Sequence, residues 1–269
     1  MDHRNLQEAV ITTENARHVR LAARLDVKGP SLIKGIQFEG LRILGSPKNF
    51  AKSYYAQGVD ELIYIDHVAS LYDRSPSGEL LSEVLREVFI PVTVGGGIRS
   101  VEDARGLLRA GADKVALNTA ATRNPRLITE LAETFGSQCI VASIEAKQRG
   151  PGSWEALFEA GRQSTGLDVV EWAEEVVSRG AGEILLTSID KDGLERGFDL
   201  DLIREVGRVS QVPLVASGGM GKYEDAYEIL RETTADALAV GSAAHYGRIT
   251  FDGLRRGLIR EAFAVRPFE

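Results

Sequence analysis

The chain has 269 residues, 43% hydrophobic and 26% charged, which is ordinary for a globular protein and enough for one α/β barrel. Its formal net charge of −7 argues against general nucleic-acid binding, although local basic groups could still hold an anionic small molecule. The single cysteine, Cys139, excludes an intrachain disulfide and a cysteine metal cluster.

The chain begins with a polar segment, residues 1–17, that has only weak periodicity. We predict that it is an N-terminal extension and that residues 18–269 form a single domain. The segment has no apolar core of the kind found in signal peptides, and no apolar run of the chain approaches membrane-spanning length. We therefore expect a cytoplasmic protein without membrane contact.

From residue 20 onward, strand-like and helix-like segments alternate. The predicted strands are Arg20–Asp26, Glu61–Asp66, Pro91–Gly95, Lys114–Asn118, Cys139–Glu145, Glu183–Ser188, Pro213–Ser217 and Asp236–Val240. The predicted helices are Asn49–Gln57, Gly78–Glu87, Val101–Ala110, Pro125–Phe135, Val169–Arg179, Asp201–Val209, Lys222–Glu232 and Phe251–Ala262. Strict alternation indicates a parallel sheet, either closed into a (β/α)₈ barrel or open and doubly wound.

The chain repeats itself, which favours the closed barrel. Pro91–Ile98 reads Pro-Val-Thr-Val-Gly-Gly-Gly-Ile, and Pro213–Met220 has a similar sequence. Gly96 and Gly218 occupy the same position in the two segments, 122 residues apart. Around the first and fifth strands, Leu25–Lys28 (Leu-Asp-Val-Lys) corresponds to Ile144–Lys147 (Ile-Glu-Ala-Lys), 119 residues later. A repeat this long exceeds the periods of solenoids and propellers, so we predict two half-barrels within one TIM barrel.

Two connections are long, residues 29–48 after the first strand and residues 146–168 after the fifth. In a barrel, both would lie at the C-terminal face, where active sites are found. Long loops at that face are usually functional, although an inert insertion is the alternative. The first of them contains Lys34.

Two carboxylates close the first and fifth predicted strands, Asp26 and Glu145. These strands oppose one another in an eight-stranded barrel, so the two side chains would face each other across the mouth as a general acid and a general base. Alternatively, each is an acid of a surface loop, but their equivalence in the repeat favours a catalytic pair. His67 lies near the rim, and no histidine has metal-ligand spacing, so we predict neither a metal nor a cofactor.

Glycines, hydroxyls and amides after four strands predict two phosphate cradles, because backbone N–H groups at helix starts bind phosphate. One would comprise Gly96, Gly97, Asn118 and Thr119, and the other Ser217, Gly218, Gly219, Gly241 and Ser242. Tight turns explain each glycine separately, but not the matched pairs Asn118-Thr119 and Gly241-Ser242. Two cradles related by the repeat indicate a substrate with a phosphate at each end.

Many motifs of the chain, spanning about residues 20–244, resemble the cyclase subunits of imidazole glycerol phosphate synthase, which act in histidine biosynthesis. The resemblance rests on Leu25-Asp26-Val27-Lys28, Lys34-Gly35, Thr93-Val94-Gly95-Gly96-Gly97-Ile98, Asn118-Thr119-Ala120-Ala121, Gly180-Ala181-Gly182-Glu183-Ile184-Leu185-Leu186-Thr187-Ser188-Ile189-Asp190, Asp192-Gly193 and Ala216-Ser217-Gly218-Gly219. A related isomerase of the same pathway shares the half-barrel repeat but lacks the long run that begins at Gly180.

The resemblance implies an ammonia-dependent lyase and cyclase in a heterodimer with a glutaminase subunit. Ammonia would pass through the barrel interior to a bisphosphorylated aminoimidazole ribonucleotide, giving imidazole glycerol phosphate and an aminoimidazole carboxamide ribotide. The family's catalytic acids match Asp26 and Glu145, and its loop lysine matches Lys34. Asp192 and Gly193 match substrate-binding positions. Its ammonia gate matches Arg20, Glu61, Lys114 and Glu183, which would pair because buried charges must be compensated.

The sequence departs from the family at Glu145, where the family has aspartate, and at Gly29-Pro30-Ser31, where the family usually has Asp-Gly-Arg. The longer acid moves the carboxyl outward by roughly 1.5 Å, on the scale of backbone bond lengths. These differences leave two alternatives to the cyclase. One is a paralogous ammonia-channelling subunit that forms amidines on a surface sugar or another metabolite. The other is a non-catalytic barrel that binds a phosphorylated metabolite.

Overall fold

The computed structural model describes residues 18–72 and 77–267, and the predicted N-terminal extension lies outside them. Eight parallel strands form a closed barrel in the order β1-β4-β5-β6-β7-β10-β11-β12, and β12 pairs again with β1. They are β1 (Arg20–Lys28), β4 (Glu61–Asp66), β5 (Val92–Gly95), β6 (Lys114–Leu117), β7 (Ile140–Gly150), β10 (Glu183–Ser188), β11 (Leu214–Ser217) and β12 (Ala237–Val240). The predicted (β/α)₈ barrel is confirmed.

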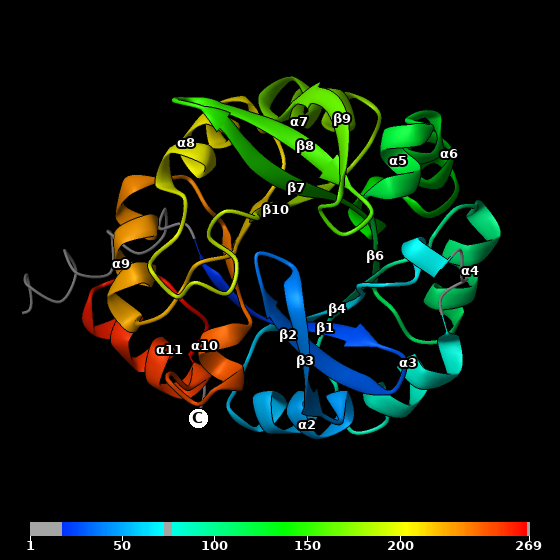
Figure 1. Cartoon of the computed structure of the whole chain (residues 1–269). Helices are drawn as coiled ribbons and strands as arrows, with labels where there is room; N and C mark the ends of the chain where they lie inside the picture. Colours follow the sequence, from blue (N-terminus) through cyan, green and yellow to red (C-terminus); the bar gives the residue numbers. More distant parts are fainter. Residues whose placement is uncertain (1–17, 73–76, 268–269) are drawn as a thin grey trace, which may run out of the picture.

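Helices form a ring around the barrel (Figure 1). They are α2 (Pro47–Ala56), α3 (Gly78–Leu85), α4 (Val101–Arg109), α5 (Thr119–Arg123), α6 (Arg126–Phe135), α7 (Val169–Ser178), α8 (Leu200–Val209), α9 (Tyr223–Glu232), α10 (Ser242–His245) and α11 (Phe251–Arg260), with the 3-10 turns η1 (Ser70–Tyr72) and η2 (Ser137–Cys139). Side chains fix several starts: Ser100 accepts from the Asp103 N–H of α4, and Asp199 from the Leu202 N–H of α8. None of the helices in the described ranges is both long and apolar enough to span a bilayer.

Both predicted long connections are present, and each folds into an antiparallel hairpin. Strand β1 continues past Asp26 and pairs with β2 (Ser31–Ile36), which pairs with β3 (Glu39–Gly45). Likewise β7 continues past Glu145 and pairs with β8 (Ser153–Phe158), which pairs with β9 (Gln163–Asp168). The two hairpins arise on opposite sides of the barrel mouth (Figure 1). Asp26 and Glu145 therefore lie within their strands rather than at their ends.

The half-barrel repeat extends to these additional elements. Each half has a first strand that continues into a hairpin, β1 and β7, and a short helix after its fourth strand, α5 and α10. The main core packs between the strands and the helices, whereas a second apolar cluster fills the barrel interior. The interior cluster consists of Ala22, Ile63, Ala116, Val141, Leu185, Val215, Ala237 and Ala239. It separates the N-terminal ends of the strands from the mouth.

Candidate active site

Asp26 lies at the mouth in a network of buried charges. Its Oδ1 accepts from Arg24 Nε at 2.9 Å, and its Oδ2 lies 3.5 Å from Lys34 Nζ. Lys34, on β2, also bonds both carboxylate oxygens of Asp192, each at 2.8 Å. Burial alone would raise the pKa of Asp26, but Arg24 and Lys34 outweigh it and hold the pKa well below its usual range. The Asp26 carboxyl is thus an anion throughout the neutral range.

The hairpin that carries Lys34 is docked onto the loop after β10. The Gln37 N–H donates to the Asp192 carbonyl at 2.9 Å, and Gln37 Nε2 donates to the Asp190 carbonyl at 3.0 Å. The Gly193 backbone lies so close that a Cβ there would come within 2.4 Å of the Gly35 carbonyl oxygen. The sequence positions Lys34, Asp192 and Gly193 are therefore brought together, although more than 150 residues separate the two segments along the chain.

Sequence reasoning did not identify Arg24, which is 4% exposed and points into the barrel. Besides its bond to Asp26, Arg24 Nη1 donates to Thr187 Oγ1 at 2.7 Å and to Ser217 Oγ at 3.0 Å. Its guanidinium carbon also lies 5.6 Å from the centroid of the Phe38 ring. A signal was present, because alternate residues of a strand share one face and Arg24 is two residues before Asp26. A charged residue at an inward position needs partners, and here they come from three strands.

Glu145 occupies the opposite side of the mouth in a different electrostatic environment. It is 7% exposed, and the backbone N–H of Gly161 donates to its carboxyl. Within the described part of the chain, the buried Oε2 atom of Glu145 has no hydrogen-bond partner. Burial raises its pKa to about 7, against the opposing attraction of Arg24. Glu145 can therefore exchange a proton near neutral pH.

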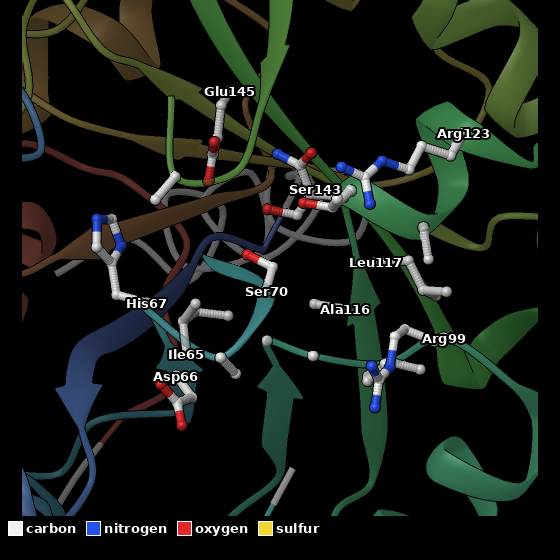
Figure 2. A pocket seen from close by; sticks show the side chains of 18 of the residues that line it. Ile65, Asp66, His67, Ser70, Arg99, Ala116, Leu117, Arg123, Ser143 and Glu145 are labelled. Carbon is white, nitrogen blue, oxygen red and sulfur yellow. The ribbon is translucent and has the colours of Figure 1, made fainter. Parts of the chain in front are cut away.

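A cavity of about 310 Å³ lies beside Glu145 and contains the first predicted phosphate cradle. Gly96, Gly97, Asn118 and Thr119 all line it, together with Arg99 and Arg123. Figure 2 shows the Glu145 carboxyl on one side of this cavity and the two arginines on the other. The arginines, which the sequence analysis did not name, add positive charge suited to a phosphate.

The second predicted cradle is narrower. Gly193, Ser217, Gly218, Gly219, Gly241 and Ser242 line a cavity of about 20 Å³ together with Arg24, Lys34 and Asp192. Gly218 has φ +93°, and a Cβ there would lie 2.7 Å from the Ser188 carbonyl oxygen, so only glycine fits without strain. The two cradles thus occupy matched places in the repeat but differ in the space they enclose.

The four residues of the predicted gate form a ring at the other end of the barrel. Arg20, Glu61, Lys114 and Glu183 are the first residues of β1, β4, β6 and β10. Arg20 bonds Glu61 at 2.9 Å and Glu183 at 2.7 Å, while Lys114 lies 2.8 Å from Glu183 and 3.4 Å from Glu61. Burial raises the pKa of Glu61 despite both cations. The ring closes the interior at the N-terminal face.

In residues 18–72 and 77–267, no three histidine, cysteine or acidic side chains are placed to hold a metal ion. Two histidines flank the mouth, His67, which is buried, and His245, which is half-buried. His67 packs edge-on against Phe38, with ring centroids 4.8 Å apart, and burial lowers its pKa. His245 Nδ1 lies 2.7 Å from the Tyr54 hydroxyl, and burial lowers its pKa to about 4. Both rings are therefore neutral at pH 7.

Comparison with known proteins identifies the family to which the chain belongs. Residues 20–250 match the family described as histidine biosynthesis protein. A Legionella pneumophila protein named imidazole glycerol phosphate synthase subunit HisF is 59% identical over 208 residues, 77% of this chain and 98% of that protein. Proteins of the same name from Clostridium botulinum and Myxococcus xanthus are 45% and 48% identical, covering 92% and 90% of this chain and 98% and 95% of their own lengths. The chain belongs to the histidine biosynthesis protein family.

Proposed function

We propose that this chain is the cyclase subunit of an imidazole glycerol phosphate synthase and uses ammonia to close the imidazole ring. The observation that carries this proposal is the placement of Asp26 and Glu145 on opposed strands, between two matched cradles. A substrate with a phosphate at each end would span the mouth, and its reacting centre would lie between the carboxyls. The shared name of the relatives over nearly their full length supports the same activity.

The ammonia would come from a glutaminase partner at the N-terminal face, in the cytoplasm. The ring of Arg20, Glu61, Lys114 and Glu183 would act as a gate, because its paired side chains lie at the strand starts where ammonia would enter. Beyond it, several interior residues are small, including Ala22, Ala116 and Ala239. An uncharged ammonia molecule can cross such an apolar interior, whereas ammonium would meet a large desolvation cost.

At the mouth, ammonia would attack the ketose carbonyl of the bisphosphorylated substrate. Protons must leave the attacking nitrogen and reach the carbonyl oxygen, which departs as water, and the carboxyls lie where they can assist. Lys34 contacts both Asp26 and Asp192 and could exchange one carboxylate for a substrate oxygen. The adduct would then close and split into imidazole glycerol phosphate and the carboxamide ribotide.

The direct test supplies purified protein with an ammonium salt and the bisphosphate substrate. We expect release of the carboxamide ribotide, with a loss of about 10²–10⁴ in turnover in Glu145→Gln. Turnover should also fall in Asp26→Asn, because this variant removes a charge beside the reacting centre. The absence of product at high protein concentration would refute the cyclase. A barrel that only binds phosphorylated metabolites would instead retain all its function in Asp26→Asn.

A second candidate is an ammonia-channelling subunit for a different amination. Two departures from the family favour it: a glutamate rather than an aspartate at position 145, and Gly29-Pro30-Ser31 in place of the usual Asp-Gly-Arg. Displacements of about 1 Å at a reacting centre can cost about a hundredfold in rate, so these changes suit a different acceptor. Such a protein would bind a glutaminase but lack cyclase activity. Rescue of a cyclase-deficient histidine auxotroph by this chain would exclude it.

A further inference from the structure

The two carboxyls of the mouth differ in the charges that surround them. Asp26 contacts two cations, Arg24 and Lys34, and Lys34 in turn contacts Asp192. All four side chains are at most 6% exposed. Two buried cations therefore lie beside two buried anions, and their formal charges balance before Glu145 is counted.

Glu145 would add a fifth charge to this balanced cluster. In the described structure it forms no ion pair and has an unpartnered Oε2, and it receives only the Gly161 N–H. An ionised Glu145 would leave the mouth with one uncompensated buried negative charge, which is costly. The neutral acid avoids that cost, and the adjoining cavity gives its free oxygen access to a ligand.

Other groups around Glu145 do not alter this balance. Beside Glu145, β10 presents Thr187 and β8 presents Leu157, and Asn118 follows β6; all three residues are uncharged. His67, across the mouth, is held neutral by burial. The other charged side chains that line the cavity are Asp66, Arg99 and Arg123, and Arg123 bonds Glu159. These side chains comprise two cations and two acids, so they add no net charge.

We propose that the two acids have separate roles: Asp26 is a fixed anion held by Arg24, and Glu145 alone of the pair exchanges protons with the reacting groups. Arg24 is a positioning residue, because it acts through Asp26. In the proposed reaction, the neutral Glu145 delivers its proton to the carbonyl oxygen, and the resulting carboxylate takes a proton from the attacking nitrogen, so no net proton is consumed. Only this last assignment rests on the proposed function, since the separation of roles concerns the free protein.

The test is a titration of the full chain without substrate, with isotope-labelled side-chain carboxyl carbons followed by NMR between about pH 4.5 and about pH 9. The resonance that disappears in Glu145→Gln should titrate with a midpoint near 7. The resonance that disappears in Asp26→Asn should remain at its ionised shift throughout. Titration of Asp26 within this range, or a constant Glu145 resonance, would overturn the proposal.

Two variants of Arg24 test whether its charge keeps Asp26 ionised. Arg24→Met removes the closest cation of Asp26, so the Asp26 midpoint should rise into the measured range, whereas Arg24→Lys should keep it low. The matched control is Arg255→Met, because Arg255 on α11 is also buried and pairs with an acid, Asp60 at 2.8 Å, away from the mouth. That control should leave Asp26 ionised. An unchanged Asp26 resonance in Arg24→Met would refute the positioning role.

A kinetic measurement separates this inference from the proposed function. With free ammonia held constant, turnover of the cyclase reaction should depend on a group with a midpoint near 7, and Glu145→Gln should lose that dependence. Arg24→Lys should retain it. Absence of cyclase turnover would refute the proposed function, while the carboxyl titration would still decide the roles of the two acids.

Discussion

Replacing Glu145 by glutamine should stabilise the fold at alkaline pH. The pKa of Glu145 rises from its ordinary value of 4.5 to about 7 on folding, mainly because the side chain is buried. Between these values the unfolded chain has already lost the proton that the folded protein retains, so stability falls as pH rises through this window and stays low above it. At 1.36 kcal/mol per pKa unit, the loss is roughly 3 kcal/mol. Glutamine has nearly the same size and cannot ionise, so the variant should lack this loss.

The assay is urea denaturation of both proteins at about pH 4.5 and about pH 8. The free energy of unfolding of Glu145→Gln, relative to that of the wild type, should increase by roughly 3 kcal/mol from the lower to the higher pH. Asp26 does not interfere, because its lowered pKa affects stability only at more acidic pH. The lowered pKa of His67 affects both proteins equally and cancels in the difference. A difference that does not change with pH would show that Glu145 is not a buried, uncompensated acid.

Three further predictions concern the gate, the second cradle and the length of the acid. Lys114→Met leaves Glu183 with one cation fewer, so it should lower the free energy of unfolding, measured by urea denaturation, by up to about 3 kcal/mol. An unchanged free energy of unfolding would contradict a paired ring. Gly218→Ala should weaken the binding of inorganic phosphate, measured by calorimetry. The control is Gly29→Ala, because Gly29 also has a positive φ but has open space around it, and this variant should keep its affinity. Equal phosphate affinities of the two variants would contradict the second cradle. Glu145→Asp should not raise turnover, because the site has adjusted to the longer acid; a gain in cyclase turnover would indicate a cyclase that has lost its optimal geometry.

The barrel could be predicted because its information is local and repeated. Each of the eight strands is a short apolar run beside a turn signal, and the observed strands begin within one residue of the predicted positions. The hairpins could not be predicted in the same way. Strand β3 is largely exposed and strand β9 is polar, so neither shows the alternation that a half-buried strand needs. The turn of the first hairpin places Gln37 and Phe38 at positive φ, which neither residue signals.

The residues of the candidate site could be predicted where both halves of the repeat carry a matching residue. They could not be predicted where only one half carries the residue. The opposed acids, both cradles and the gate followed from matched positions or from resemblance. The contact of Lys34 with Asp192 depends on how a hairpin folds across the mouth, which no local pattern encodes. Arg24 carried the correct strand periodicity, but its counterpart in the repeat is uncharged, so the comparison between halves gave no sign of it.

That counterpart is Ser143, 119 residues after Arg24, as Glu145 is 119 residues after Asp26. A perfectly duplicated barrel would accept a molecule with two phosphates in either of two opposite orientations, with equal affinity. The serine leaves about 310 Å³ of space on its side, whereas the arginine helps to enclose a cavity of only about 20 Å³ on the other. Each 1.4 kcal/mol of difference between the two orientations gives about a tenfold preference. The difference between Arg24 and Ser143 therefore contributes to an asymmetry by which the two ends of a ligand can be distinguished.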